Sequence, residues 1–182
     1  FIGGKESIDL INSFFMVDLF FLFEAELAFK YFIQTVNNSV DAKNGLYQVY
    51  FNSSPHKSYF PNKLIPKENE LDVIPDHKLM STGELSSHGV IGAFNFLKTK
   101  ETRLATVHSN RGCRGSCTYC SVRNFNGPGV RHRPVQSVID ELLLLRNQFG
   151  IRHVLWLDDD FLHDHKRVLT LFNEMINQNV DM

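Results

Sequence analysis

The stretch LATVHSNRGCRGSCTYC, residues 104–120, contains the only three cysteines of the chain, Cys113, Cys117 and Cys120. They are spaced C-x3-C-x2-C and follow an apolar segment, Leu104–Val107, that predicts a short β-strand. Iron–sulfur clusters are usually held by four cysteine thiolates. Three thiolates on one loop can each hold one iron of a four-iron cluster, which leaves the fourth iron open to a substrate or cofactor.

The cysteines have two other interpretations, a disulfide and a structural zinc site. A disulfide is disfavoured because the count is odd, and the lack of other cysteines indicates a reducing compartment, for which we expect the cytoplasm. A structural zinc site needs four ligands, and His108 or His132 could add the fourth. Zinc modules usually pair two separated cysteine knuckles, and this chain has only one. The spacing therefore favours iron and sulfide over zinc.

The chain after residue 101 predicts the order strand, loop, helix, strand, loop, helix. A helix is expected from Pro134 to about Gln148, with Gly150 as its C-terminal cap. A buried strand is expected over His153–Leu157, and Asp164 can cap the last helix. Apolar spacing gives that last helix a predicted core face of Val168, Leu169, Phe172, Met175 and Ile176.

Three consecutive acids, Asp158, Asp159 and Asp160, follow the second strand of this unit, as the cysteines follow the first. The carboxyl ends of parallel strands meet at one edge of an α/β sheet, where ligands bind. Asp158 and Asp159 are therefore candidate ligand-binding residues. The alternative is a solvated turn, in which acids are common.

The N-terminal part has a different pattern. Residues 1–40 predict strand, helix, strand, helix, with a buried strand at Val17–Phe23 and a helix at Glu24–Val36, which implies a parallel sheet. Residues 41–100 are rich in turn-forming residues and predict an irregular linker, with one strand of a small hairpin at Leu46–Phe51. The predicted domains are 1–40, 41–100 and 101–182.

Composition narrows the function class. The chain has 182 residues, 43% hydrophobic and 21% charged, with a net charge of -1, so it is globular and shows no overall preference for nucleic acid. The most apolar run, Phe14–Phe23, is far shorter than the roughly 20 residues of a membrane span. Five arginines and no acid lie between His108 and Ile139, which indicates either a basic rim for anionic cofactors or a solvated loop.

The cysteine segment resembles the radical S-adenosylmethionine (radical SAM) enzymes. Tyr119 stands where the family has an aromatic residue before the third cysteine, and Trp156–Phe161 is similar to the family's second-strand motif. The resemblance implies a [4Fe-4S] cluster whose open iron binds S-adenosylmethionine and cleaves it to a 5′-deoxyadenosyl radical. It also implies that Tyr119 packs by the adenine, that Asp158 and Asp159 lie near the S-adenosylmethionine pocket, and that flavodoxin or ferredoxin donates electrons.

The N-terminal part resembles the subgroup that also carries a cobalamin-binding domain. Gly3 and Gly4 are similar to the last glycine pair of that flavodoxin-like domain, where small residues approach the nucleotide tail; an ordinary turn is the alternative. Phe23 and Ala25 replace glycines usual at the end of the later strand. The implied fold is α/β: the end of a flavodoxin-like cobalamin-binding-type domain, an irregular linker, and the first units of a partial (β/α) radical SAM barrel.

Cobalamin would imply methyl transfer, but the substrate is not predictable from this part of a barrel. A cobalamin-independent methylthiotransferase is an alternative, disfavoured because residues 1–100 contain no cysteine. A zinc-stabilised nucleic-acid-binding module is the alternative from another class. The chain opens inside an apolar segment at Phe1, so we expect a piece of a longer enzyme that is inactive when isolated.

Overall fold

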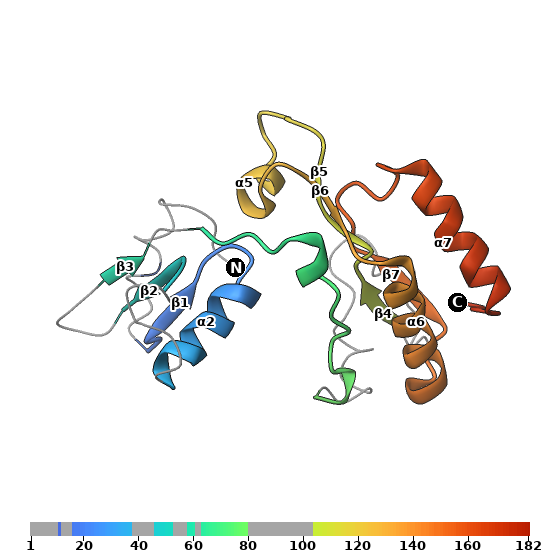
Figure 1. Cartoon of the computed structure of the whole chain (residues 1–182), viewed down its shortest axis with the longest axis horizontal. Coiled ribbons are helices and arrows are strands. Elements are labelled where there is room, and N and C mark those ends of the chain that lie inside the picture. The colour runs from blue at the N-terminus through green and yellow to red at the C-terminus, as the bar shows by residue number, and fades with distance from the viewer. Residues whose placement is uncertain (1–10, 12–15, 38–45, 53–57, 61–62, 80–103) are drawn as a thin grey trace. The chain divides into compact units, whose positions relative to one another are not determined.

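The structure is a computed structural model that describes residue 11 and residues 16–37, 46–52, 58–60, 63–79 and 104–182 (Figure 1). The chain divides into two compact units, and this division does not follow chain order. Unit 1 comprises Phe1–Lys67 and Gly115–Gly129, and unit 2 comprises Glu68–Arg114 and Val130–Met182. The second half of the cysteine segment therefore belongs to unit 1 and the first half to unit 2.

Unit 1 contains a three-stranded sheet in the order β1-β2-β3. Its strands are β1 (Leu19–Phe21), β2 (Val49–Phe51) and β3 (Ser58–Phe60), and both pairs are antiparallel. The prediction of a parallel sheet is therefore wrong for β1, whereas the hairpin strand predicted within residues 46–51 is confirmed as β2. Apolar spacing reveals a strand but not the direction of its partner, and the partner of β1 lies beyond the helix, in the predicted linker.

Helix α2 (Glu26–Val36) follows β1, close to its predicted bounds. Aromatic side chains join it to the sheet, because the Phe21 ring lies 5.4 Å from Phe29 and 5.5 Å from Phe32, both edge-on. Edge-on aromatic pairs add to the stability gained from burying apolar area.

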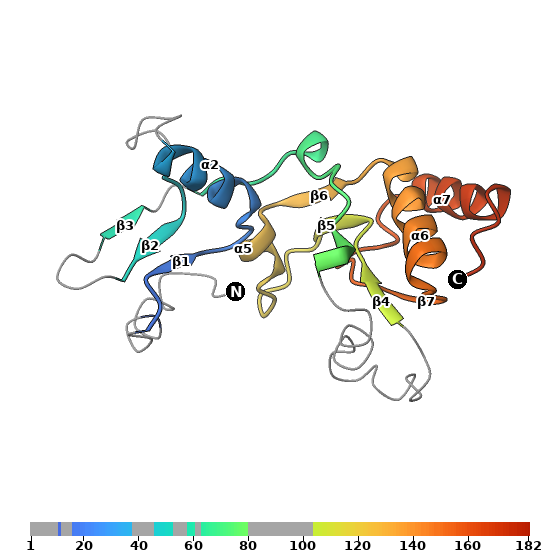
Figure 2. The same ribbon diagram turned by 90° about the horizontal axis from the view of Figure 1, so that it is seen from below.

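Unit 2 is built on β4 (Leu104–Val107) and β7 (His153–Trp156), which pair in parallel, so both predicted strands and their direction are confirmed. The connection between them ends with helix α6 (Val135–Phe149), which lies beside the pair (Figures 1 and 2), and α7 (His165–Asn177) follows β7. The buried core is formed by Ala105, Val107, Val138, Ile139, Leu142, Leu145, Ile151, Leu171 and Val180.

The helix ends in unit 2 follow the predicted capping residues. Pro134, predicted as the first helical residue, stands one position earlier as the N-cap of α6. Gly150 ends α6 with φ 65°, a left-handed conformation that glycine adopts without steric cost, and its N–H donates to the Arg146 carbonyl. Asp164 caps α7 by accepting from the Arg167 N–H at 3.0 Å.

The predicted core face of α7 is partly wrong. Val168 and Leu171 are buried, whereas Leu169 is 64% and Ile176 73% exposed. The apolar positions of this helix form two stripes, and only the stripe containing Leu171 faces the core of unit 2. No helix in the described ranges is long and apolar enough to cross a membrane.

A second pair of strands carries the cysteines. Strands β5 (Asn110–Cys113) and β6 (Gly129–His132) form a two-stranded sheet, and the connection between them includes the short helix α5 (Val122–Asn126). Two turns of 3-10 helix, Glu68–Glu70 and His77–Leu79, precede β4. This sheet is not predicted from the sequence, because neither strand shows an apolar alternation.

Candidate functional site

The three cysteines lie at the end of β5 and in the turn that follows it. Cys113 is the last residue of β5 and half-buried, and its thiol lies 3.8 Å from Oδ2 of Asp160. Cys117 and Cys120 are exposed, and the Cys120 N–H donates to the Cys117 carbonyl at 3.1 Å, which closes a tight turn. Tyr119, inside this turn, is 91% exposed.

The donor set fits an iron–sulfur cluster better than it fits a single ion. None of the three cysteines forms a disulfide, and thiolates are the ligands that such clusters require. Cys113 belongs to unit 2, and Cys117 and Cys120 belong to unit 1. Among the residues that the structure describes, no three His, Cys, Asp or Glu side chains are already arranged around a common metal position. The cysteines therefore remain ligands predicted from the sequence.

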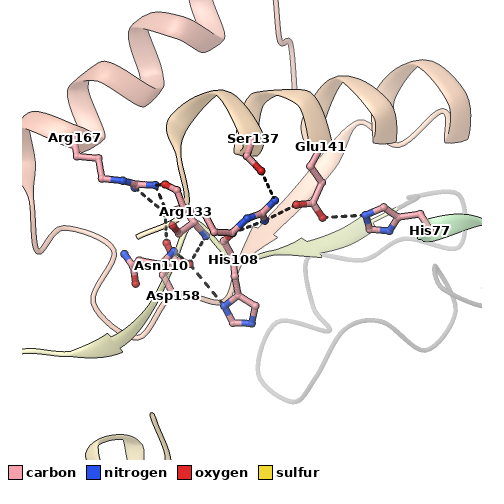
Figure 3. Close-up of polar contacts among 9 residues, drawn as sticks. His77, His108, Asn110, Arg133, Ser137, Glu141, Asp158 and Arg167 are labelled. Carbon is pink, nitrogen blue, oxygen red and sulfur yellow. Dashed lines mark hydrogen bonds and ion pairs between the residues drawn. The ribbon is translucent and has the colours of Figure 1, made fainter. Parts of the chain in front are cut away.

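Asp158 accepts hydrogen bonds from the residues that lead into β5 (Figure 3). Its side chain is fully buried, and its Oδ1 accepts from the Ser109 N–H at 2.7 Å and from the Asn110 N–H at 3.1 Å. Its Oδ2 accepts from the Ser109 hydroxyl at 2.5 Å. Asp158 thus joins the residues after β7 to the residues between β4 and β5.

The pKa of Asp158 reflects this setting. Burial raises the pKa, but the nearby His108 imidazole, whose Nδ1 lies 3.8 Å away, and the hydrogen bonds from Ser109 and Asn110 outweigh burial. The net pKa lies below the ordinary value, so the carboxylate is charged near neutral pH.

The other two acids have different surroundings. Asp160 pairs with Arg114, whose Nε lies 3.1 Å from Oδ2, and its carbonyl accepts from the Asn110 side chain at 3.2 Å. Asp159, between its two neighbours, is exposed. The prediction that Asp158 and Asp159 contact a cofactor stays a prediction, and the structure separates their roles, since only Asp159 is exposed.

Arg167 of α7 connects the residue before β5 to the residue after β6. Its guanidinium donates to the Ser109 carbonyl at 3.0 Å, to the Ser109 hydroxyl at 3.2 Å and to the Arg133 carbonyl at 2.7 Å. Burial lowers the pKa of Arg167, and the Asp158 charge partly offsets this effect. An arginine fits this position because its fixed fork of donors can satisfy several carbonyls at once.

A second arginine, Arg133, forms a buried ion pair with Glu141. Arg133 donates to Oε2 of Glu141 at 2.6 Å and to the His108 carbonyl at 2.9 Å, and both charged side chains are almost completely buried. Oε1 of Glu141 lies 2.9 Å from Nε2 of His77. A third group, Ser137, accepts from Arg133 at 3.3 Å. Figure 3 shows these residues as one connected network in unit 2.

Sequence reasoning missed this network. One signal was present: Glu141 occupies a core position of α6 among Val138, Leu142 and Leu145, and a buried carboxylate there requires a charged partner. No comparable signal marks Arg167, because its contacts with Ser109 connect residues 58 positions apart. Gly3 and Gly4, the predicted cobalamin-side residues, lie outside the described residues.

The histidines beside the network stack on each other. The rings of His132 and His163 are 5.8 Å apart and nearly parallel at 19°. Burial, followed by the Arg167 charge, lowers the pKa of His132, so its ring is neutral at neutral pH. The His132 N–H donates to the Glu68 carboxylate at 3.1 Å.

The described chain has the fold of the matching part of cobalamin-dependent radical SAM enzymes, which confirms the resemblance predicted from the sequence. The radical S-adenosylmethionine methyltransferase TsrM from Kitasatospora setae matches with a TM-score of 0.65 and 17% identity, over 91% of this chain and 30% of TsrM. The cobalamin-dependent radical enzyme OxsB matches with a TM-score of 0.60 and 18% identity, over 86% of this chain and 20% of OxsB.

Those two proteins have been solved with their cofactors. TsrM has been solved with tryptophan and an S-adenosylmethionine analogue, and separately with cobalamin and a [4Fe-4S] cluster. OxsB has been solved with aqua-cobalamin and S-adenosylmethionine. At these identities the likeness establishes the fold of the present chain, and the cofactors are those of the neighbours.

Two sequence relatives are methyltransferases by name, and a third, matched over 36 residues at 42% identity, is a putative methylthiotransferase of Methanocaldococcus jannaschii. The cytidylyl-2-hydroxyethylphosphonate methyltransferase of Streptomyces wedmorensis is 31% identical over 109 residues, covering 60% of this chain and 20% of the relative. An uncharacterized methyltransferase of Pyrococcus horikoshii is 26% identical over 159 residues, covering 87% of this chain and 32% of the relative. The chain thus spans a third or less of the length of these curated relatives. No protein-family model matches it.

Proposed function

We propose that this chain is the part of a radical SAM methyltransferase that holds the [4Fe-4S] cluster and begins the S-adenosylmethionine site. Cys113, Cys117 and Cys120 hold three irons through their thiolates. When bound and reduced, the cluster supplies the electron that cleaves S-adenosylmethionine to methionine and a 5′-deoxyadenosyl radical, and flavodoxin or ferredoxin reduces it. In this proposal residues 1–40 end a cobalamin-binding-type domain, 41–100 form a linker and 101–182 begin the barrel.

The observation that carries the proposal is the bonding of Asp158 to the backbone ahead of the cysteines. Its carboxylate accepts from the N–H groups of Ser109, directly before β5, and of Asn110, the first residue of β5, and β5 ends at Cys113. The backbone that leads to Cys113 is therefore hydrogen-bonded to the residue that follows the carboxyl end of β7, the parallel neighbour of β4. Ligand sites in parallel α/β folds form at this edge.

Two exposed side chains are assigned to the S-adenosylmethionine side of the site. Tyr119 lies in the turn between Cys117 and Cys120 and can pack against the adenine. Asp159 is exposed after β7 and can accept from the amino group of the cofactor. Asp158 acts on the cofactor only through the backbone that it holds.

Cobalamin is the second proposed cofactor, and methyl transfer is the proposed reaction class. Support comes from the cobalamin found in TsrM and OxsB and from the methyltransferases among the sequence relatives. Gly3 and Gly4 are the residues of this chain assigned to the cobalamin side. The substrate is proposed only as a methyl acceptor.

Metal analysis tests the cluster. Anaerobic reconstitution of the full-length gene product should give about four irons per chain with acid-labile sulfide, and Cys117→Ala should lose most of both. Ser116→Ala is the matched control, because Ser116 is exposed next to Cys117 and is not a thiol. One zinc per chain without sulfide, or full iron retention in Cys117→Ala, would refute the assignment.

A binding titration tests the acid. In the reconstituted full-length product, Asp159→Ala should weaken S-adenosylmethionine binding about tenfold, roughly the loss of one hydrogen bond to a charged group, at unchanged iron content. Asp72→Ala removes an exposed acid outside the cysteine segment and serves as the control. Equal affinities of wild type and Asp159→Ala would show that Asp159 does not bind the cofactor and is only part of a solvated turn.

A further inference from the structure

Phe23 has a strained backbone conformation. Its φ is 60°, in the left-handed region, which costs a residue with a bulky side chain about 1–2 kcal/mol and costs glycine almost nothing. The turn after β1 is therefore strained at Phe23, where glycine would adopt the same conformation without strain.

The Phe23 ring contacts the helix that follows the cysteines. Its centroid lies 6.3 Å from that of Phe125 in α5, at 61°. The Lys63 ammonium lies 4.3 Å from the Phe23 centroid, over the ring, and donates to the Asn124 carbonyl at 2.6 Å. Phe23, Lys63 and Phe125, here called the α5 clamp, all belong to unit 1.

Helix α5 needs support from outside. It has five residues, and so short a helix is not stable by itself in water. It begins two residues after Cys120 and ends at Gly127, whose φ is 82°. A Cβ on Gly127 would lie 2.6 Å from Cδ1 of Ile65, so residues 63–65 fit closely against this end of the helix as well.

We infer that Phe23 is a positioning residue for the cysteine segment: its ring holds α5, and α5 fixes the turn that contains Cys117 and Cys120. The strain at Phe23 is retained because glycine, which would relieve it, has no ring. The inference rests on the proposed cluster, and it adds that the turn after β1 sets how firmly the cluster is held.

Hydrogen exchange tests the clamp without any cluster. Two hydrogen bonds of α5 report on the helix: the Phe125 N–H donates to the Ser121 carbonyl, and the Gly127 N–H donates to the Arg123 carbonyl. In the cluster-free full-length product, Phe23→Gly loses the aromatic pair and the cation–π contact, and Phe125→Ala loses the aromatic pair. Each variant should speed exchange at these two amides about tenfold. Phe23→Tyr keeps the ring and should exchange at the wild-type rate.

Two comparisons separate positioning from general stability. Phe29→Ala removes a half-exposed ring that packs on Phe21 in the same unit, and should leave α5 exchange unchanged. Phe23→Gly should unfold at a higher denaturant concentration than Phe23→Ala, because only glycine relieves the strain, yet both should release α5 equally. Exchange that simply follows global stability across these variants would overturn the inference.

Iron release to a chelator completes the test. Wild type and Phe23→Tyr should lose iron slowly from the reconstituted cluster, and Phe23→Gly and Phe125→Ala about tenfold faster, with the double variant no faster than either single one. Wild-type iron release from Phe23→Gly would overturn the inference and leave the proposed function intact. A wild-type protein that takes up no iron and sulfide would refute the proposed function itself.

Discussion

Replacing Asp158 should destabilise unit 2 much more than replacing its neighbour Asp159. The Asp158 side chain is fully buried and accepts three hydrogen bonds, whereas Asp159 is exposed. Two substitutions separate the contributions: Asp158→Asn keeps the shape and removes the charge, and Asp158→Ala removes the acceptors as well.

The expected magnitudes follow from the atoms involved. In Asp158→Asn the amide oxygen can still accept from the N–H groups of Ser109 and Asn110, which both bond to Oδ1, so mainly the charge is lost, at about 1.5–3 kcal/mol. In Asp158→Ala both N–H groups lose their acceptor, and the free energy of unfolding should fall by about 3–5 kcal/mol. Asp159→Asn should change it by no more than about 0.5 kcal/mol.

The difference between wild type and Asp158→Asn should depend on pH. The pKa of Asp158 in the folded state lies below its ordinary value of 3.8, so the unfolded chain takes up a proton at a higher pH than the folded one. The stabilisation is complete well above pH 3.8 and is lost as the pH falls through the folded-state pKa. The urea denaturation curves of wild type and Asp158→Asn should therefore be well separated at neutral pH and should converge in acid.

Trp156 provides the assay. It is the single tryptophan of the chain, ends β7 two residues before Asp158, and lies 5.2 Å from the Phe161 ring. Urea denaturation followed by its fluorescence reports on unit 2. Equal midpoints for the Asp158→Asn and Asp159→Asn variants, or a separation that persists unchanged into acid, would refute the reasoning.

Three further predictions use the same fluorescence assay. Glu141→Ala should cost about 3–5 kcal/mol, because it leaves the buried Arg133 charge without its carboxylate; a cost equal to that of an exposed substitution would contradict this. Wild-type stability should rise with pH up to the ordinary histidine value of 6.5, because the folded-state pKa of His132 lies below it, and His132→Asn should flatten that rise. Gly150→Ala should cost about 1 kcal/mol, because φ is 65° there, and an unchanged midpoint would argue against that conformation.

Most elements of unit 2 could be predicted from the sequence because local signals agree there. Apolar runs predict β4 and β7, the helical spacing predicts α6, and Gly150 and Asp164 end or begin helices as their chemistry requires. The parallel direction also follows, since a helix that connects two adjacent strands of a sheet returns the chain to the same end.

The sheet of unit 1 could not be predicted for a physical reason. The apolar residues of β1 fit parallel and antiparallel pairing equally well. Its partner strand is β2, and the paired residues Phe21 and Val49 are 28 positions apart. The direction in which β1 pairs depends on long-range packing, which the local spacing of apolar residues does not reveal. The two apolar stripes of α7 pose the same difficulty, because spacing cannot tell which stripe meets the core.

The three consecutive acids illustrate how much of the candidate site the sequence could give. Their place after a parallel strand was predictable, and their division of roles was not. Asp158 and Asp160 both contact residues 109–114, Asp158 through buried hydrogen bonds and Asp160 through Arg114, whereas Asp159 is exposed. A ligand bound to Asp159, as proposed, would leave the contacts of Asp158 and Asp160 with residues 109–114 in place.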